Sequence, residues 1–164
     1  MKNLPHPDNK YLEATEGWLG LGDQVSANEE LEHISPAFRN NPLVLEMRWK
    51  IYVKAEKWEL AAEVGRIMSE ILPDSALGFI HYAYSLHELK RPQEAYAVLI
   101  PVVAKFSDST IRYNLACYSC QLGNLEEAWQ WLQKAIELSG RKDVRLIALV
   151  DPDLQPLWSK IEAL

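Results

Sequence analysis

The sequence has no long apolar run, no secretory leader and only two cysteines, and each absence excludes a class of protein. Its uninterrupted apolar stretches are a few residues long, whereas a membrane-spanning helix needs about 20 residues. The N-terminus lacks the apolar core of a secretory signal. We therefore expect a soluble, cytoplasmic protein with no membrane partner, whose thiols stay reduced.

Positive charge is also scarce. The chain has 17 Lys and Arg against 23 Asp and Glu, for a net charge of -6. A surface of this sign disfavours sequence-independent binding to nucleic acid or to anionic lipid. Lys50, Lys54 and Lys57 form a tight basic cluster, but neighbouring glutamates dilute it. The sequence thus predicts no nucleic-acid partner.

Recognisable catalytic motifs are missing as well. The sequence contains no G-x-S-x-G nucleophile motif, no Walker phosphate loop and no G-x-G-x-x-G dinucleotide motif. The four histidines have no recognisable motif around them. We therefore predict that the protein is not an enzyme and has no catalytic residues, no cofactor and no bound metal.

What the sequence does contain is an internal repeat. Ala27, Ala61, Ala95 and Ala128 recur 34, 34 and 33 residues apart. Each alanine follows a short polar turn, and apolar residues on both sides of the turn recur at helical spacing. Gly123 in the last turn suits the left-handed conformation that ends a helix. A period of this length with two helices per copy indicates an all-α helical-repeat protein.

The repeat predicts how the chain is organised. A helix pair cannot bury its apolar face alone, so neighbouring pairs stack and share a core. We predict an N-terminal arm at 1–7 and a capping segment of one or two helices at 143–164. Between them we predict four antiparallel helix pairs, at 8–41, 42–75, 76–108 and 109–142.

Two departures from the repeat pattern carry predictions of their own. Trp49 and Gly65 of the second copy reverse the small and large positions of the other copies, which we interpret as an exchange that conserves core volume. A functional tryptophan pocket is the alternative. Pro101 falls inside the expected second helix of the third copy and should kink it.

The chain resembles the tetratricopeptide repeat (TPR) family. The period, the first-helix pair Leu115-Ala116, the second-helix alanine and the closing Pro73 match the degenerate signature of that family. The resemblance implies an α-solenoid, wound as a right-handed superhelix, and a non-catalytic scaffold that binds a peptide or protein segment in its concave groove. It does not identify the partner.

In this family the first helix of each pair lines the concave groove. Carried over by register, the resemblance implies these groove residues: Glu46, Lys50, Lys54, Tyr84, His87, Tyr113, Cys117, Cys120 and Gln121. The lysines could pair with acidic side chains of a partner, and the tyrosines offer the amphipathic area that binding sites favour. The alternative is that these residues are solvated or covered by the C-terminal tail, which is the capping segment at 143–164.

The sequence leaves two other functions open. Cys117 and Cys120, with His87 from the preceding repeat, could form a metal- or thiol-sensing module, although packing or groove lining is the simpler interpretation of two mid-helix cysteines. The chain could also be a self-associating assembly protein that forms homo-oligomers, or resemble the small TPR chaperones that escort secreted proteins.

Overall fold

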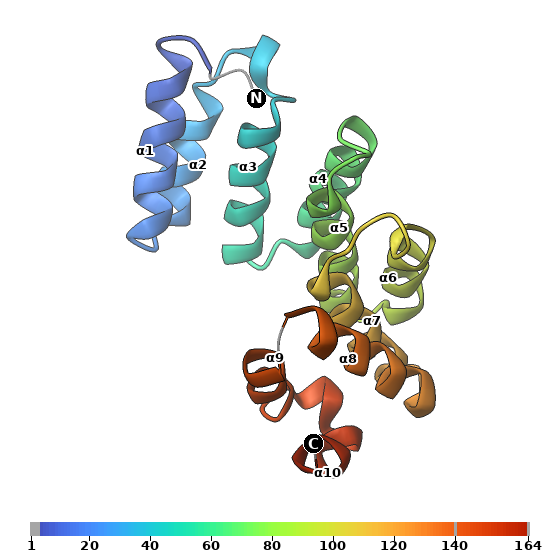
Figure 1. Ribbon diagram of the computed structural model, residues 1–164. Helices are drawn as coiled ribbons and strands as arrows, with labels where there is room; N and C mark the ends of the chain where they lie inside the picture. Colours follow the sequence, from blue (N-terminus) through green and yellow to red (C-terminus); the bar gives the residue numbers. More distant parts are fainter. Residues whose placement is uncertain (1–3, 140, 164) are drawn as a thin grey trace. The chain divides into compact units, whose positions relative to one another are not determined.

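The computed structural model describes residues 4–139 and 141–163, and over these residues the chain is α-helical with no strand (Figure 1). It divides into two compact units, Met1–His81 and Tyr82–Leu164. The boundary falls inside one helix, α5 (Ala76–Glu88). None of the helices in the described residues is both long and apolar enough to cross a membrane.

The first unit contains two helix pairs and the start of α5. Its elements are α1 (Asp8–Gly20), α2 (Gln24–Glu32), the 3-10 helix η1 (Pro36–Phe38), α3 (Pro42–Lys54) and α4 (Trp58–Ile71). Apolar side chains of α2, of α3 and of the segment between α2 and η1 form its main core, with Leu31, Ile34 and Val44 almost wholly buried. Asn41 caps α3 through Oδ1, which accepts a hydrogen bond from the Leu43 N–H at 3.0 Å.

The second unit begins with the end of α5 and carries the C-terminal tail. Its elements are α6 (Pro92–Leu99), the 3-10 helix η2 (Ile100–Val102), α7 (Ser109–Gln121), α8 (Leu125–Ser139), α9 (Arg141–Ala148), the 3-10 helix η3 (Pro152–Leu157) and α10 (Trp158–Glu162). Both α7 and α8 contact η3. Leu154 and Leu157 of η3 and Ile161 of α10 are buried, so the tail is part of the core of this unit.

The four turns predicted from the sequence share one backbone geometry. Their first residues, Gly22, Glu56, Lys90 and Gly123, have positive φ angles of 81°, 55°, 60° and 81°. In each turn this residue donates its N–H to the carbonyl three residues back, and the next residue donates to the carbonyl five residues back. This is the Schellman motif that ends α-helices.

The repeated alanines occupy equivalent places after these turns. Ala27, Ala61, Ala95 and Ala128 each donate a backbone N–H to the carbonyl of the residue four positions earlier, which immediately precedes the second helix. All four side chains are fully buried. A larger side chain at any of them would separate two helix axes, and this explains why the residue type recurs with the turn.

The expected kink at Pro101 is not present. Helix α6 ends at Leu99, and Pro101 lies in the separate 3-10 helix η2. Proline has no N–H to donate into an α-helix, and its ring clashes with the carbonyl four residues back. At this position the chain therefore ends the α-helix instead of bending it.

Candidate functional site

In the first unit, the predicted groove residues lie along α3. Glu46 and Lys50 are one turn apart and form an ion pair, with 2.8 Å between Oε1 and Nζ. Lys54 is exposed at the end of the helix. A partly exposed pair of this kind contributes little to stability.

An aromatic pair lies close to these charges. The rings of Trp49 and His81 stack with their centroids 3.6 Å apart and their planes 3° from parallel. Burial lowers the pKa of His81 to about 4, which Glu46 opposes and Lys50 reinforces. The imidazole is therefore neutral at physiological pH.

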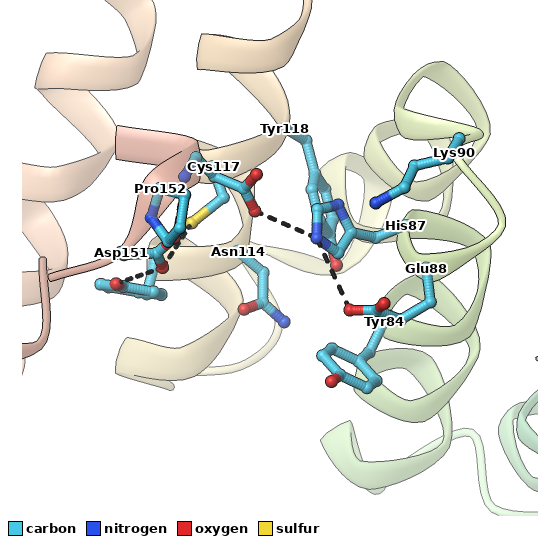
Figure 2. Close-up of a pocket in the computed structure, with 11 residues that line it drawn as sticks. Tyr84, His87, Glu88, Lys90, Asn114, Cys117, Tyr118, Asp151 and Pro152 are labelled. Carbon is cyan, nitrogen blue, oxygen red and sulfur yellow. Dashed lines mark hydrogen bonds and ion pairs between the residues drawn. The ribbon is translucent and has the colours of Figure 1, made fainter. Parts of the chain in front are cut away.

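In the second unit, α5 and α7 bring four predicted groove residues around one cavity of about 450 Å³ (Figure 2). These are Tyr84 and His87 of α5 and Tyr113 and Cys117 of α7. The members of each pair are three or four positions apart and so share one helix face. Two other predicted residues, Cys120 and Gln121, are absent from the described lining of this cavity.

The cavity is also lined by residues that were not predicted from the sequence. Glu88 and Lys90 lie at the end of α5, Asn114 and Tyr118 lie on α7, and Asp151, Pro152 and Asp153 come from the tail. Asn114 and Tyr118 are each one position after a predicted residue, about 100° further around the helix, so the stripe chosen by register did not include them. The tail residues are at least 30 positions away in sequence, and no local pattern connected them to α7.

Asp151 anchors the tail against α7. Its Oδ1 accepts the Asp153 N–H at 3.0 Å and so caps η3. Its Oδ2 accepts the Tyr113 hydroxyl at 2.7 Å and lies 3.6 Å from the Cys117 Sγ, whose S–H donates to it. One carboxylate thus begins a helix and also holds two of the predicted groove residues.

Asp153 extends this contact to α5. Its Oδ1 accepts a hydrogen bond from Gln121 Nε2 at 2.8 Å, and its Oδ2 lies 3.0 Å from His87 Nε2. The other ring nitrogen of His87, Nδ1, lies 3.2 Å from Gln121 Oε1. The tail therefore contacts Tyr113, Cys117 and Gln121 of α7 and forms one wall of the cavity.

Burial and the tail carboxylates keep both thiols protonated. The pKa of Cys117 is raised well above its ordinary value, first by burial and then by Asp151 and Asp153. Burial, with the same carboxylates, raises the pKa of Cys120 to about 11. A redox-sensing cysteine needs a lowered pKa, so neither thiol is prepared for that chemistry in this state.

No protein-family model and no curated protein sequence matches the chain. Among solved structures, MamA 41-end from Desulfovibrio magneticus RS-1 is 17% identical, with a TM-score of 0.74 over 97% of this chain and 95% of that one. A thermophilic TPR protein of Thermus thermophilus is 19% identical, with a TM-score of 0.73 over 98% of this chain and 84% of that one.

A further structure, MamA MSR-1 C2, is 23% identical, with a TM-score of 0.68 over 82% of this chain and 78% of that one. Likeness at these identities concerns the fold. It shows that the chain has a TPR-like, all-α helical-repeat fold, as the sequence predicted.

Proposed function

Proceeding from a TPR-like fold, we propose that the chain is a non-catalytic interaction scaffold that binds a peptide or protein segment with its first helices. The observation that carries the proposal is the cavity in the second unit. Four residues chosen by register, Tyr84, His87, Tyr113 and Cys117, line it together. Tyrosine rings beside a concave polar pocket are typical of sites where a partner side chain is anchored.

The proposal divides the chain into repeats and gives each unit its own binding character. We propose repeats at 8–41, 42–75, 76–108 and 109–142, with the tail as a cap. On α3, Lys50 and Lys54 would favour acidic side chains. The cavity of the second unit has three carboxylates, those of Glu88, Asp151 and Asp153, and would favour a basic one.

The remaining groove residues have supporting roles in this proposal. Glu46 holds Lys50, Gln121 holds the tail, and Cys120 is a buried packing residue. We also place the protein in a reducing, cytoplasmic compartment, since both cysteines are free thiols.

Charge reversal on α3 tests the proposal. The double variant Lys50→Glu and Lys54→Glu should lose proteins that the wild type captures from its native host, measured by quantitative mass spectrometry. The matched control is Lys57→Glu with Lys134→Glu, which changes the net charge equally at exposed positions outside the first helices. Equal capture by both variants, with unchanged circular dichroism, would refute the role of α3.

Self-association is a second candidate because α9 and the turn after it expose apolar side chains. Leu146, Ile147 and Val150 are 65%, 55% and 76% exposed. Exposed apolar clusters of this kind mark contact surfaces. Light scattering over a range of concentrations should show a mass above that of the monomer, and the variant Leu146→Glu should abolish the increase. A monomer at every concentration eliminates this candidate.

A further inference from the structure

A thiol and two carboxylates converge where the tail meets α7. The Cys117 Sγ and one oxygen from each of Asp151 and Asp153 all lie within 4.8 Å of one another. Cys117 is buried, and the two aspartates are partly buried. The cluster joins a helix to a segment more than 30 residues later, so its members are brought together by the tertiary fold.

We propose that Cys117, Asp151 and Asp153 form a binding site for one zinc-like divalent cation. Tetrahedral zinc with bonds of about 2.3 Å to sulfur and about 2.1 Å to oxygen places those two ligand atoms about 3.6 Å apart. The distance between Cys117 Sγ and Asp151 Oδ2 is 3.6 Å. Two of the three ligand atoms are thus already spaced for a shared ion.

The carboxylates of this site are held by neighbouring side chains. Tyr113 donates its hydroxyl to Asp151 at 2.7 Å, and Gln121 donates its amide to Asp153 at 2.8 Å. Metal-binding carboxylates in proteins are commonly oriented by such hydrogen bonds, which strengthen binding. Tyr113 and Gln121 are positioning residues in this proposal.

His87 of α5 lies beside the cluster and contacts one of its carboxylates. Its Nε2 lies 3.0 Å from Asp153 Oδ2, and its Nδ1 lies 3.2 Å from Gln121 Oε1. His87 and Gln121 thus both hold the Asp153 carboxylate.

The cavity also holds a buried polar group without a hydrogen-bond partner among the described residues. The Tyr118 hydroxyl is buried and has no hydrogen-bond partner among the described residues, and Tyr118 lines the cavity beside Cys117 (Figure 2). Buried hydroxyl groups are normally paired with protein or with a bound species. This observation points to a polar ligand in the cavity and does not depend on the thiol.

The ligand types select the metal. Thiolate sulfur favours zinc and its soft neighbours, whereas magnesium and calcium prefer sites made only of oxygen. Binding replaces the S–H bond of Cys117 by a metal–sulfur bond, and the proton leaves to solvent. The ion would then join the tail to α7 through three bonds in place of one weak S–H hydrogen bond.

Cobalt and zinc titrations of the full chain, stripped with a chelator, test this inference without any partner protein. We expect one Co²⁺ per chain, release of a proton and a near-ultraviolet sulfur-to-cobalt absorption band, with Zn²⁺ displacing Co²⁺. Cys117→Ser should abolish the band, and Cys120→Ser, the matched control, should retain it. Gln121→Ala should keep the band but weaken binding by about 10- to 100-fold.

Three results would overturn the inference. One is the absence of Co²⁺ and Zn²⁺ binding, which would mean that the hydrogen bonds of the cluster are its only interactions. Another is a band that survives Cys117→Ser, and the third is a band lost equally in Cys120→Ser. Because the readout is metal binding by the isolated chain, failure here leaves the proposed interaction function untouched.

Discussion

Trp49 and His81 lie face to face, with ring centroids 3.6 Å apart and planes 3° from parallel. Trp49 also packs against the cluster of Leu45, Val64 and Met68, so it contributes to the core of the first unit as well as covering the imidazole. The stack keeps His81 only 8% exposed. The main consequence is electrostatic, because protonating a buried imidazole costs free energy.

The stability of the first unit should therefore fall in mild acid. Unfolded His81 takes up a proton below about pH 6.5, whereas folded His81 stays neutral down to about pH 4. The unfolded state binds more protons in this window, so the stabilisation present above pH 6.5 is lost as the pH falls towards 4. The loss from this group is about 3 kcal/mol.

Urea unfolding between pH 4 and pH 7 measures this loss. His81→Phe keeps an aromatic ring against Trp49 but cannot bind a proton, so its stability should change less over the same range. Glu46 and Lys50 are unchanged in the variant, so the comparison reports on the imidazole of His81. Parallel pH profiles for the two proteins would contradict the assignment.

Gly78 is a point of close backbone approach, and its substitution should destabilise the first unit. A Cβ at this residue would lie 2.6 Å from the Met68 carbonyl carbon and 2.8 Å from the Ser69 Cα, both in the backbone of α4. We expect Gly78→Ala to lower the free energy of unfolding by about 2 kcal/mol or more. Gly17→Ala on exposed α1, where a Cβ meets nothing within 4 Å, should raise it by about 0.5–1 kcal/mol. Equal changes in the free energy of unfolding for the two variants would contradict the close packing of α5 against α4 at Gly78.

Replacing a glycine and replacing a lysine at the positive-φ position of these turns should have opposite effects on the free energy of unfolding. Gly22→Ala puts a side chain at a φ of 81° and should lower the free energy of unfolding by about 1 kcal/mol. Lys90→Gly relieves a left-handed residue at a φ of 60° and should raise it by about 0.5 kcal/mol, after the greater freedom of unfolded glycine is counted. Thermal unfolding measures both, and a stabilising Gly22→Ala would contradict the turn geometry.

Two tyrosines of α7 should respond differently to loss of the hydroxyl. Tyr113 donates to Asp151, so Tyr113→Phe removes a partly buried, charge-assisted hydrogen bond and should lower the free energy of unfolding by about 1–3 kcal/mol. The Tyr118 hydroxyl has no partner among the described residues, so Tyr118→Phe should be neutral or stabilising. Hydrogen exchange should also quicken in η3 for Tyr113→Phe only. Identical behaviour of the two variants would mean that the tail is not held by Tyr113.

The structural features that were predicted correctly are those that neighbouring residues in the sequence determine. The alanines and the four turns follow from helical spacing and from glycine, and they proved to share one backbone geometry even where Glu56 and Lys90 replace glycine. The predicted kink at Pro101 was wrong, because a helix that ends and a helix that bends have the same local sequence signal.

Only part of the candidate site could be predicted, because sequence patterns identify residues on one helix face and not contacts made by tertiary packing. Tyr84, His87, Tyr113 and Cys117 could be chosen by register because each pair belongs to one helix. Asp151 and Asp153 reach the cavity through tertiary packing of the tail, and no periodicity in the sequence records a contact over more than 30 residues.

Site-specific photocrosslinking in the native host tests the interaction function most directly. A benzophenone amino acid would replace Lys54 on α3, Tyr84 on α5 or, as the control, Lys134 on α8. We expect adducts with a protein partner from Lys54 or Tyr84 and none from Lys134. Adducts that form equally from Lys134, or from that position alone, would contradict a binding surface on the first helices.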